Sequence, residues 1–180
     1  MTEIREYRET DSASWLRCRL LSFFGTEYYD DVVTQRPAFD NPAHRLVAVD
    51  DDTVVGLMDV EIFTDRATID VLAVHPDRQR HGLATQLLEA VLPRLQVDVL
   101  DAWTRGDASA NDWYQRSGFT ENYRYLHVYK SWQDDSSGFE TPEGLGRPVT
   151  AFMHAPTALE AAMRERFSRV HICRQYVRSL

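Results

Sequence analysis

The sequence predicts a mixed α/β fold in which one sheet is covered by helices. Residues 45–74 contain three consecutive strand patterns separated by short polar turns. Residues 67–130 then follow the order strand, helix, strand, helix, strand, which is typical of a mixed sheet with flanking helices. The chain has 180 residues, 43% of them hydrophobic, which fits one domain or one domain with an appendage.

The N-terminal part is expected to contain an edge strand, a helix and an irregular connection. Residues 4–8 alternate weakly between polar and apolar positions, as in an edge strand. Thr10 or Asp11 can cap a helix that ends at Gly25. Residues 26–41 are rich in Tyr and Asp and are expected to form a short second helix and a loop.

The remaining elements follow from apolar periodicity and from turn residues. Strands are expected at residues 45–49, 54–63, 67–74, 97–103, 120–130, 149–153 and 170–177. Helices are expected at residues 82–96, 108–117 and 157–168. Pro93 lacks a backbone donor, so the first of these helices should kink or end early.

Residues 134–146 are polar, Gly-containing and acidic, which is typical of a linker or a loop. We therefore divide the chain into a core (residues 1–132), a polar linker (133–147) and a strand–helix–strand extension (148–180). The extension is expected to pack on the core and to complete the sheet.

The most informative pattern is a buried strand that leads through a charged turn into an amphipathic helix, over residues 71–95. The first turn of a helix presents free N–H groups and a partial positive charge, which suit a phosphate or diphosphate. Gly82 allows a ligand to approach the backbone closely, and Arg78, Arg80 and His81 add donors and charge. Neither G-x-G-x-x-G nor G-x-x-x-x-G-K-[ST] occurs.

Three segments carry a family resemblance. Residues 79–84 (QRHGLA) resemble the Q/R-x-x-G-x-G/A acyl-CoA loop of the GNAT superfamily of N-acetyltransferases. Residues 69–76 (IDVLAVHP) are similar to the family's fourth strand, and residues 112–119 (DWYQRSGF) to its second signature. The resemblance covers roughly residues 4–130, and it implies a mostly antiparallel central sheet that splays at mid-sheet around the cofactor.

The resemblance also implies which residues hold acetyl-CoA, the expected co-substrate. These residues are Leu72, Ala73, Val74, Gln79, Arg80, His81, Gly82, Leu83, Ala84, Thr85 and Asn111. Backbone N–H groups around residues 73–74 would bind the thioester carbonyl and the pantetheine amides, as an added strand would. The sequence departs from the family at Asp107, where the family often has a cofactor-binding Asn.

Acetyl transfer from a thioester needs mainly positioning, a proton acceptor for the amine and a donor for the leaving thiolate. The resemblance implies that Tyr114 is the acid, and a phenol pKa near ~10 is close to the ~8.5 of a thiol. For the base we favour Asp70 and compare it with Asp101 on the next strand. Asp59 and Glu61 are candidates for the lining of an acidic acceptor pocket.

Strand alternation places these carboxylates relative to the sheet. It predicts Asp70 on the same face as Leu72 and Val74, with Ile69, Val71 and Ala73 on the opposite face. A carboxylate on a half-buried strand can have a raised pKa and draw a proton through water.

Composition narrows the class of partner. The net charge of −8 and a sequence pI of about 5.2 disfavour nucleic acid and anionic membranes, and favour cationic small molecules. From Arg147 onward, six Arg and two Glu give +4, against −12 for residues 1–146. This basic tail either packs against the acidic body or approaches an anionic ligand. The six His show no metal-ligand spacing, so we expect no metal.

We expect an acyl-CoA-dependent N-acyltransferase that transfers acetyl to a primary amine by direct attack in a ternary complex. The acceptor would be a small molecule or a peptide. A charged N-terminus and two separated cysteines favour a cytoplasmic protein with free thiols, and the family often forms homodimers. One alternative is a CoA-binding sensor without turnover. Another is a tRNA-modifying acyltransferase, which the acidic charge disfavours and the basic tail keeps open.

Overall fold

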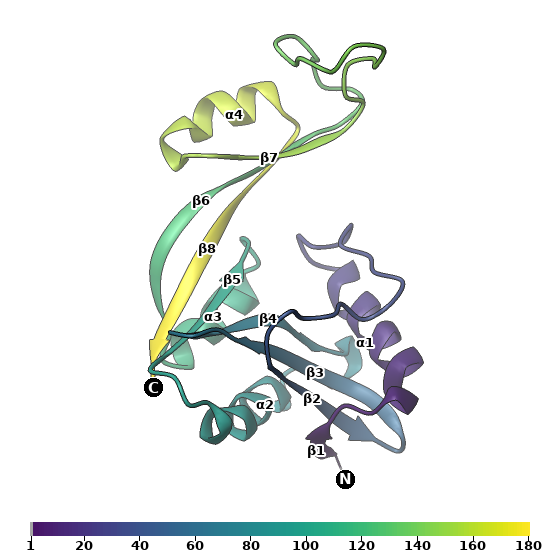
Figure 1. The fold of residues 1–180 in the computed structure, drawn as a ribbon, viewed down its shortest axis with the longest axis vertical. Coiled ribbons are helices and arrows are strands. Elements are labelled where there is room, and N and C mark those ends of the chain that lie inside the picture. The colour runs from purple at the N-terminus through teal and green to yellow at the C-terminus, as the bar shows by residue number, and fades with distance from the viewer. Residues whose placement is uncertain (1) are drawn as a thin grey trace.

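The computed structural model describes residues 2–180, which form one eight-stranded sheet and four α-helices (Figure 1). The sheet order is β1-β2-β3-β4-β5-β8-β6-β7, and β4–β5 is the parallel pair among otherwise antiparallel neighbours. The strands are β1 (Glu3–Glu6), β2 (Ala43–Asp50), β3 (Thr53–Ile62), β4 (Ala67–Val74), β5 (Val99–Thr104), β6 (Thr120–Lys130), β7 (Ala151–Ala155) and β8 (Arg169–Ser179). The helices are α1 (Ser12–Phe24), α2 (Leu83–Val91), α3 (Ala108–Arg116) and α4 (Glu160–Arg166). The predicted mixed, mostly antiparallel fold is confirmed.

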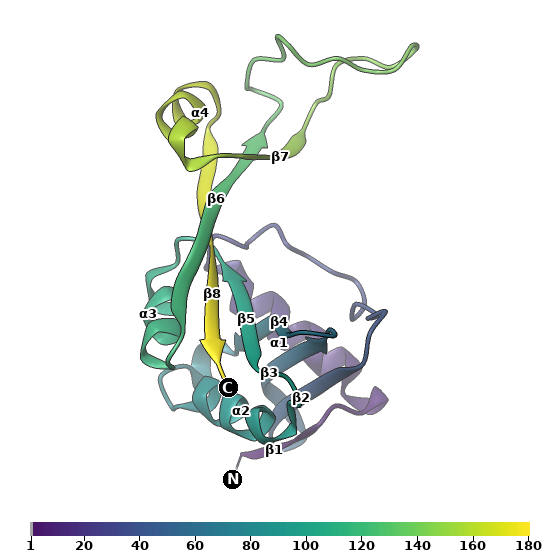
Figure 2. The ribbon, with the colours of Figure 1, turned by 60° about the vertical axis from the view of Figure 1, so that its left-hand side comes forward.

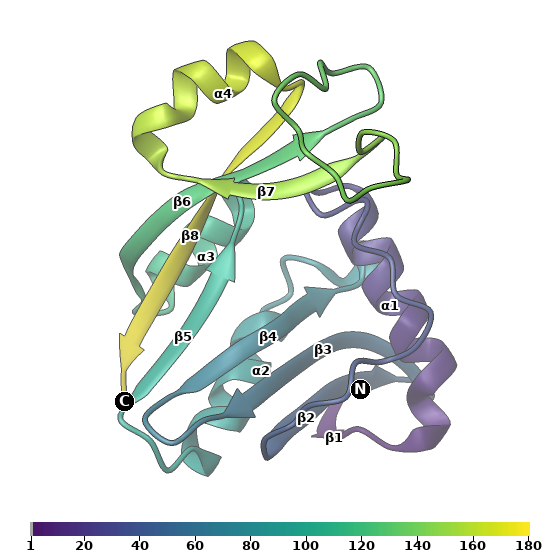
Figure 3. The same ribbon diagram turned by 45° about the horizontal axis from the view of Figure 1, so that its top comes forward.

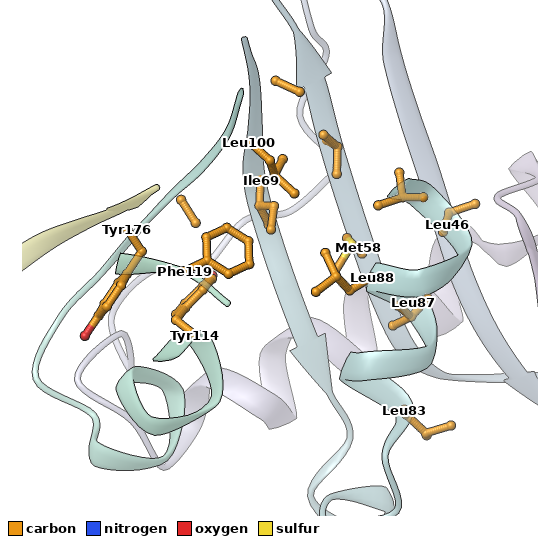
Figure 4. Packing of buried hydrophobic residues seen from close by; sticks show 14 of the residues in the cluster. Leu46, Met58, Ile69, Leu83, Leu87, Leu88, Leu100, Tyr114, Phe119 and Tyr176 are labelled. Carbon is orange, nitrogen blue, oxygen red and sulfur yellow. The ribbon is translucent and has the colours of Figure 1, made fainter. Parts of the chain in front are cut away.

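Helices cover the two faces of the sheet unequally. On one face, Trp15 and Cys18 of α1 pack against β2, β3 and β4. On the other face, α2 and α3 contribute to a second core that Figure 4 shows from close by. There Leu87 and Leu88 of α2 lie near Met58, whereas Tyr114 and Tyr176 lie on the other side of Ile69 (Figure 4). A third, smaller core lies between α4 and the outer ends of β6 and β8.

The sheet opens between β4 and β5. These strands pair only over Ala67–Ile69 with Leu100–Ala102, and they diverge beyond that point (Figure 3). The far side of the opening is formed by β5, β8, β6 and β7, and the outer part of these strands projects with α4 away from the body (Figures 1 and 2). Strand β8 lies between β5 and β6, so it joins β5 to the projecting part.

Two helical predictions need comment. The short helix expected within residues 26–41 is wrong, because that segment forms turns and irregular structure. Its backbone is held by side chains instead: Arg19 donates to the Asp31 carbonyl and pairs with its carboxylate. The early end predicted at Pro93 is confirmed, since α2 ends at Val91 and a 3-10 helix follows over Leu92–Arg94.

Simple alternation along β4 is also wrong. Asp59 pairs with Val71 but Val60 pairs with Ile69, so Asp70 is an extra residue without an opposite partner. Because of this bulge, side chains two residues apart on either side of Asp70 point to opposite faces of the sheet. Ile69 therefore packs in the α2 core, and Val71 in the α1 core.

Two of the six arginines of the basic tail pair with acidic groups of residues 1–146. Arg169 pairs with Asp30, and Arg174 lies 3.5 Å from a Glu121 carboxylate oxygen. Arg178 instead donates to the Ser117 carbonyl. Within residues 2–180, no helix is long and apolar enough to cross a membrane.

Candidate active site

A large cleft occupies the opening between β4 and β5. Its volume is about 1160 Å³, above the ~300–1,000 Å³ that is usual for small-molecule pockets. Side chains from α1, the α1–β2 segment (residues 25–42), β4, α2, β5 and α3 line it. The cleft therefore has room for an extended cofactor together with a second substrate.

The N-terminus of α2 opens into this cleft. Gly82 has φ +78°, a left-handed conformation that costs an L side chain about 1–2 kcal/mol, and Arg80 also has a positive φ. The first intrahelical bond runs from the Gln86 N–H to the Gly82 carbonyl, at 3.0 Å. The N–H groups of residues 83–85 come before this bond and have no intrahelical acceptor. The N-cap residue is Gly82, so no N-cap side chain accepts from them. These donors can bind an anion.

The edge of β4 beyond Ile69 is open as well. His75 donates its N–H to the Val55 carbonyl of β3 at 2.9 Å. Peptide groups alternate in direction along a strand, so the N–H groups of Leu72 and Val74 point away from β3 and toward the cleft. Gln79 Nε2 donates to the Val74 carbonyl at 3.1 Å, in agreement with this direction. Of the two amides expected to bind a carbonyl, Val74 thus faces the cleft and Ala73 faces β3.

Tyr114 projects from α3 into the wall of the cleft. Its ring is 6% exposed, stacks on Tyr176 at a centroid distance of 5.2 Å and meets Phe119 edge to face. Within the described chain no group hydrogen-bonds its hydroxyl. Burial raises the pKa of Tyr114 well above its usual value, which favours the protonated phenol.

Asp70 of β4 is one of the carboxylates that line the cleft. It is exposed to the cleft, and no described residue hydrogen-bonds or ion-pairs with it. The surrounding protein displaces part of its hydration and raises its pKa, an effect that Arg19 opposes and that Glu61 and Asp31 increase.

The other candidate carboxylates have structural partners. Asp101 is 2% exposed and accepts hydrogen bonds from Thr68 and Gln175. Asp59 is 1% exposed and lies 3.2 Å from the Arg36 guanidinium. Burial raises the pKa of Asp59 to about 6 in spite of this pairing. Neither residue lines the cleft.

Most of the sequence-predicted cofactor residues come together in the cleft. Those that line it are Leu72, Ala73, Val74, Gln79, Arg80, Gly82, Leu83, Ala84 and Thr85. The structure does not bring His81 or Asn111 into it. The Asn111 amide donates to the carbonyls of Arg105 and Asp107 and accepts from the Tyr176 hydroxyl, so it braces the start of α3.

Asp107, the departure from the family pattern, also has a structural partner. Both of its carboxylate oxygens accept from the Glu27 N–H, at 3.1 and 3.3 Å. Burial raises the pKa of Asp107, and the nearby Glu27 carboxylate adds to the effect. The carboxylate thus anchors the α1–β2 segment at the rim of the cleft.

Sequence reasoning missed the lining residues from α1, the α1–β2 segment and β5. They include Arg19, Tyr28, Asp31, Trp103 and Thr104. For Trp103 the sequence predicts only a place on the strand beside the motif strand, and the separation of the two strands that exposes it to the cleft is a tertiary feature. The first three belong to elements whose position relative to the cleft depends on tertiary packing.

Comparison with known proteins agrees with the fold. Residues 41–121 match the family described as the acetyltransferase (GNAT) domain. A GNAT acetyltransferase structure from Staphylococcus aureus Mu50 aligns with 100% of this chain and 99% of its own, with a TM-score of 0.61 and 16% identity. The ribosomal-protein-S18-alanine N-acetyltransferase from Escherichia coli aligns with 99% of this chain and 94% of its own, at 0.56 and 17%.

A GNAT acetyltransferase from Elizabethkingia anophelis with acetyl-CoA bound aligns with 99% of this chain and 98% of its own, at a TM-score of 0.54 and 15% identity. No curated protein matches the sequence. Residues 41–121 are thus similar to the GNAT acetyltransferase domain, and the solved structures share the fold of the chain. The family indicates an acyl-CoA-dependent N-acetyltransferase.

Proposed function

We propose that the protein transfers acetyl from acetyl-CoA to a primary amine by direct attack in a ternary complex. The observation that carries the proposal is the composition of the cleft. Free helix N–H groups, an open strand edge, Tyr114 and the Asp70 carboxylate line the same space. A thioester and an amine held together there need little covalent help from the protein.

Acetyl-CoA would lie along one side of this space. The diphosphate binds the N–H groups of residues 83–85, where the helix dipole favours negative charge, with Arg80 beside it. The pantetheine amides pair with the exposed edge at Leu72 and Val74, as an added strand would. The Val74 N–H is the donor available to the thioester carbonyl.

Tyr114 would stabilise the leaving group. Attack of the amine nitrogen on the thioester carbon forms the C–N bond, and collapse of the intermediate breaks the C–S bond and releases a thiolate. The phenol pKa is raised and that of a thiol is near ~8.5, so the phenol donates a hydrogen bond rather than its proton. The proton that the attacking nitrogen loses as the amide forms passes finally to the thiolate, so that CoA leaves as a thiol.

Asp70 would accept the proton that the amine loses. An acceptor that arrives as an ammonium ion must be deprotonated before its lone pair can attack. The raised pKa of the Asp70 carboxylate makes it a stronger base than an ordinary surface aspartate. A water molecule between carboxylate and amine can carry the proton.

The test is CoA release from acetyl-CoA with a panel of primary amines and N-terminal peptides, followed by initial-rate kinetics. We expect turnover with intersecting double-reciprocal lines, as direct attack in a ternary complex requires. Parallel lines would show a covalent acetyl-enzyme and contradict direct attack. Binding of acetyl-CoA without turnover on any acceptor would favour the alternative, a CoA-binding sensor.

A further inference from the structure

A row of rings lies on the same face of the sheet as α1, over β5, β6 and β7, which α1 does not cover. We call it the aromatic face and define it by Trp103 of β5, Tyr123, Tyr125 and His127 of β6, and Phe152 and His154 of β7. Trp103 meets Tyr125 at 5.5 Å between ring centroids, Tyr125 meets His154 at 4.6 Å, and His127 meets Phe152 at 4.9 Å. The face is therefore continuous from the cleft to β7.

Strand register explains why these rings share a face. Trp103 and Tyr123 both pair with Gln175 of β8, and His127 pairs with His154 of β7. The alternate residues, such as Ala102 and Leu126, point to the opposite side and pack in the cores that include α3 and α4. No helix of the described chain packs on the aromatic face, and Trp103, Tyr123 and Phe152 are 38%, 57% and 51% exposed.

Trp103 brings the aromatic face to the apex of the cleft. The last β4–β5 pair is Ile69 with Ala102, so Asp70 and Trp103 are the next residues on the two diverging strands. Both line the cleft. Trp103 points away from the α3 side, and Asp70 interacts electrostatically with Arg19 of α1. A carboxylate and an indole thus flank the apex on the α1 side, away from the N-terminus of α2.

The charge around this point is negative. Arg19, Glu61 and Asp31 are the charged groups that act on Asp70, and Arg19 is already paired with Asp31. A cation that enters here gains an unpaired carboxylate as its partner. The His127 ring itself adds no positive charge, since burial lowers its pKa to about 4. The Arg105 guanidinium, which donates to His127 Nδ1, is only 5% exposed and lies 3.9 Å from an Asp30 carboxylate oxygen.

We propose that the acceptor is a primary amine with a flat aromatic body, an inference that rests on the proposed function. The ammonium pairs with Asp70 and the ring packs on Trp103 and Tyr125. Contact between the ligand ring and the Trp103 or Tyr125 ring adds binding free energy beyond that of buried area. An indole face also attracts a cation. A second copy of the chain is the alternative occupant of the aromatic face, and light scattering on Trp103→Ala distinguishes the two.

The test compares three amines with acetyl-CoA by CoA release: 2-phenylethylamine, 2-cyclohexylethylamine and n-butylamine. Burying a phenyl ring supports a preference of roughly tenfold or more in kcat/KM for 2-phenylethylamine over n-butylamine. Trp103→Ala should remove most of that preference through KM of the amine, and Trp103→Phe should restore part of it. Trp132→Ala, an exposed tryptophan outside the cleft, is the matched control and should leave the preference unchanged.

Binding is measured in parallel, so that the two proposals can fail separately. Saturation-transfer NMR on the protein with CoA should show 2-phenylethylamine bound, and 2-phenylethanol, which lacks the charge, bound at least about tenfold more weakly. Asp70→Asn should remove this difference. If 2-phenylethylamine binds in this way but is never acetylated, the proposed function fails and the acceptor site stands.

Other outcomes overturn the acceptor site while leaving acetyl transfer intact. One is turnover of n-butylamine or a peptide N-terminus as efficient as that of 2-phenylethylamine. Another is an unchanged preference in Trp103→Ala. Conversion of a dimer to a monomer by Trp103→Ala, seen by light scattering with the amine preference unaltered, would assign the aromatic face to a second copy instead.

Discussion

The two sides of the cleft differ in how they are built. The proposed cofactor side comes from one continuous stretch, residues 72–85, and offers mainly backbone N–H groups. The proposed acceptor side is assembled from α1, the α1–β2 segment, β4 and β5, and offers side chains such as Asp70 and Trp103. Backbone groups recognise what all acyl-CoA molecules share, whereas side chains can be exchanged without disturbing the strand–loop–helix unit.

This difference has an energetic counterpart. The cofactor side depends on a local conformation, the left-handed glycine before α2. The acceptor side depends on long-range polar contacts that hold the α1–β2 segment. Glu27 bonds to Asp107 and Gly106, and its carboxylate lies 3.0 Å from a His171 ring nitrogen. Perturbing one side should therefore leave the other side largely intact.

The largest expected effect is at Tyr114, where the two sides meet. Tyr114→Phe removes the donor to the thiolate and keeps the ring that stacks on Tyr176. Loss of one hydrogen-bond donor to developing negative charge lowers kcat by about 10²–10³-fold, and we expect a decrease of this size. Stopped-flow or steady-state CoA release measures it. The affinity for acetyl-CoA should stay within about twofold, and an unchanged kcat would remove Tyr114 from the mechanism.

The second effect probes the buried ion pair beneath the acceptor side. The Asp59 carboxyl binds its proton more tightly in the folded protein, with a pKa of about 6, than in the unfolded chain. Stability contributed by the protonated form is therefore lost as pH rises from about 4 to 6. The loss is about 3 kcal/mol at 1.36 kcal/mol per pKa unit.

Asp59→Asn cannot lose a proton, so its unfolding free energy should lack this decline. Urea unfolding at pH 4, 5, 6 and 7 compares the two proteins. The difference between the variant and the parent should shift in favour of the variant as pH rises, whatever its value at pH 4. Parallel curves for the two proteins would contradict the raised pKa.

The third prediction isolates the cofactor side. Gly82→Val places a β-branched residue at φ +78°, and the strain of about 1–2 kcal/mol should distort the N–H groups of α2. We expect acetyl-CoA to bind about tenfold more weakly by calorimetry. Gly144→Val is the matched control, because Gly144 has φ +84° and nothing within 4 Å of an added Cβ. Equal loss of affinity in both variants would show a general loss of stability rather than a local site.

The smallest expected effect on acetyl-CoA binding concerns Asn111, which the family resemblance assigns to the cofactor. Asn111→Ala removes its bonds to two carbonyls and to the Tyr176 hydroxyl, so it should destabilise the protein by about 1–3 kcal/mol. Thermal unfolding should show a lower Tm, with the acetyl-CoA affinity nearly unchanged. A tenfold weaker affinity at an unchanged Tm would restore the cofactor role.

The sequence predicts the elements whose signals are local. Strand β4 has the predicted bounds, residues 67–74, and α2 ends at Val91, before Pro93, as predicted. The failures arise where distant residues decide. The β4 bulge depends on the register with β3, and the turns of residues 26–31 are held by Arg19 and by Arg169, which lies far along the chain.

The candidate site divides along the same line. Periodicity and glycine placement identify residues 72–85, because a strand–loop–helix unit is encoded over a short stretch. Asn111 and His81 come from the same reasoning, yet their orientation depends on neighbouring elements. Trp103 reaches the cleft only because β4 and β5 separate after Ala102, which nothing in β5 itself records.

The central place of β8 has a consequence for how the protein acquires its shape. Strands β5 and β6 do not pair with each other, and each pairs with β8, which follows both in the chain. During synthesis, the N-terminal half can pack around α1 and α2 while β6 still lacks its inner neighbour. The aromatic face and the part of the cleft near Tyr114 therefore form last, after residues 169–179 have left the ribosome and paired with both β5 and β6.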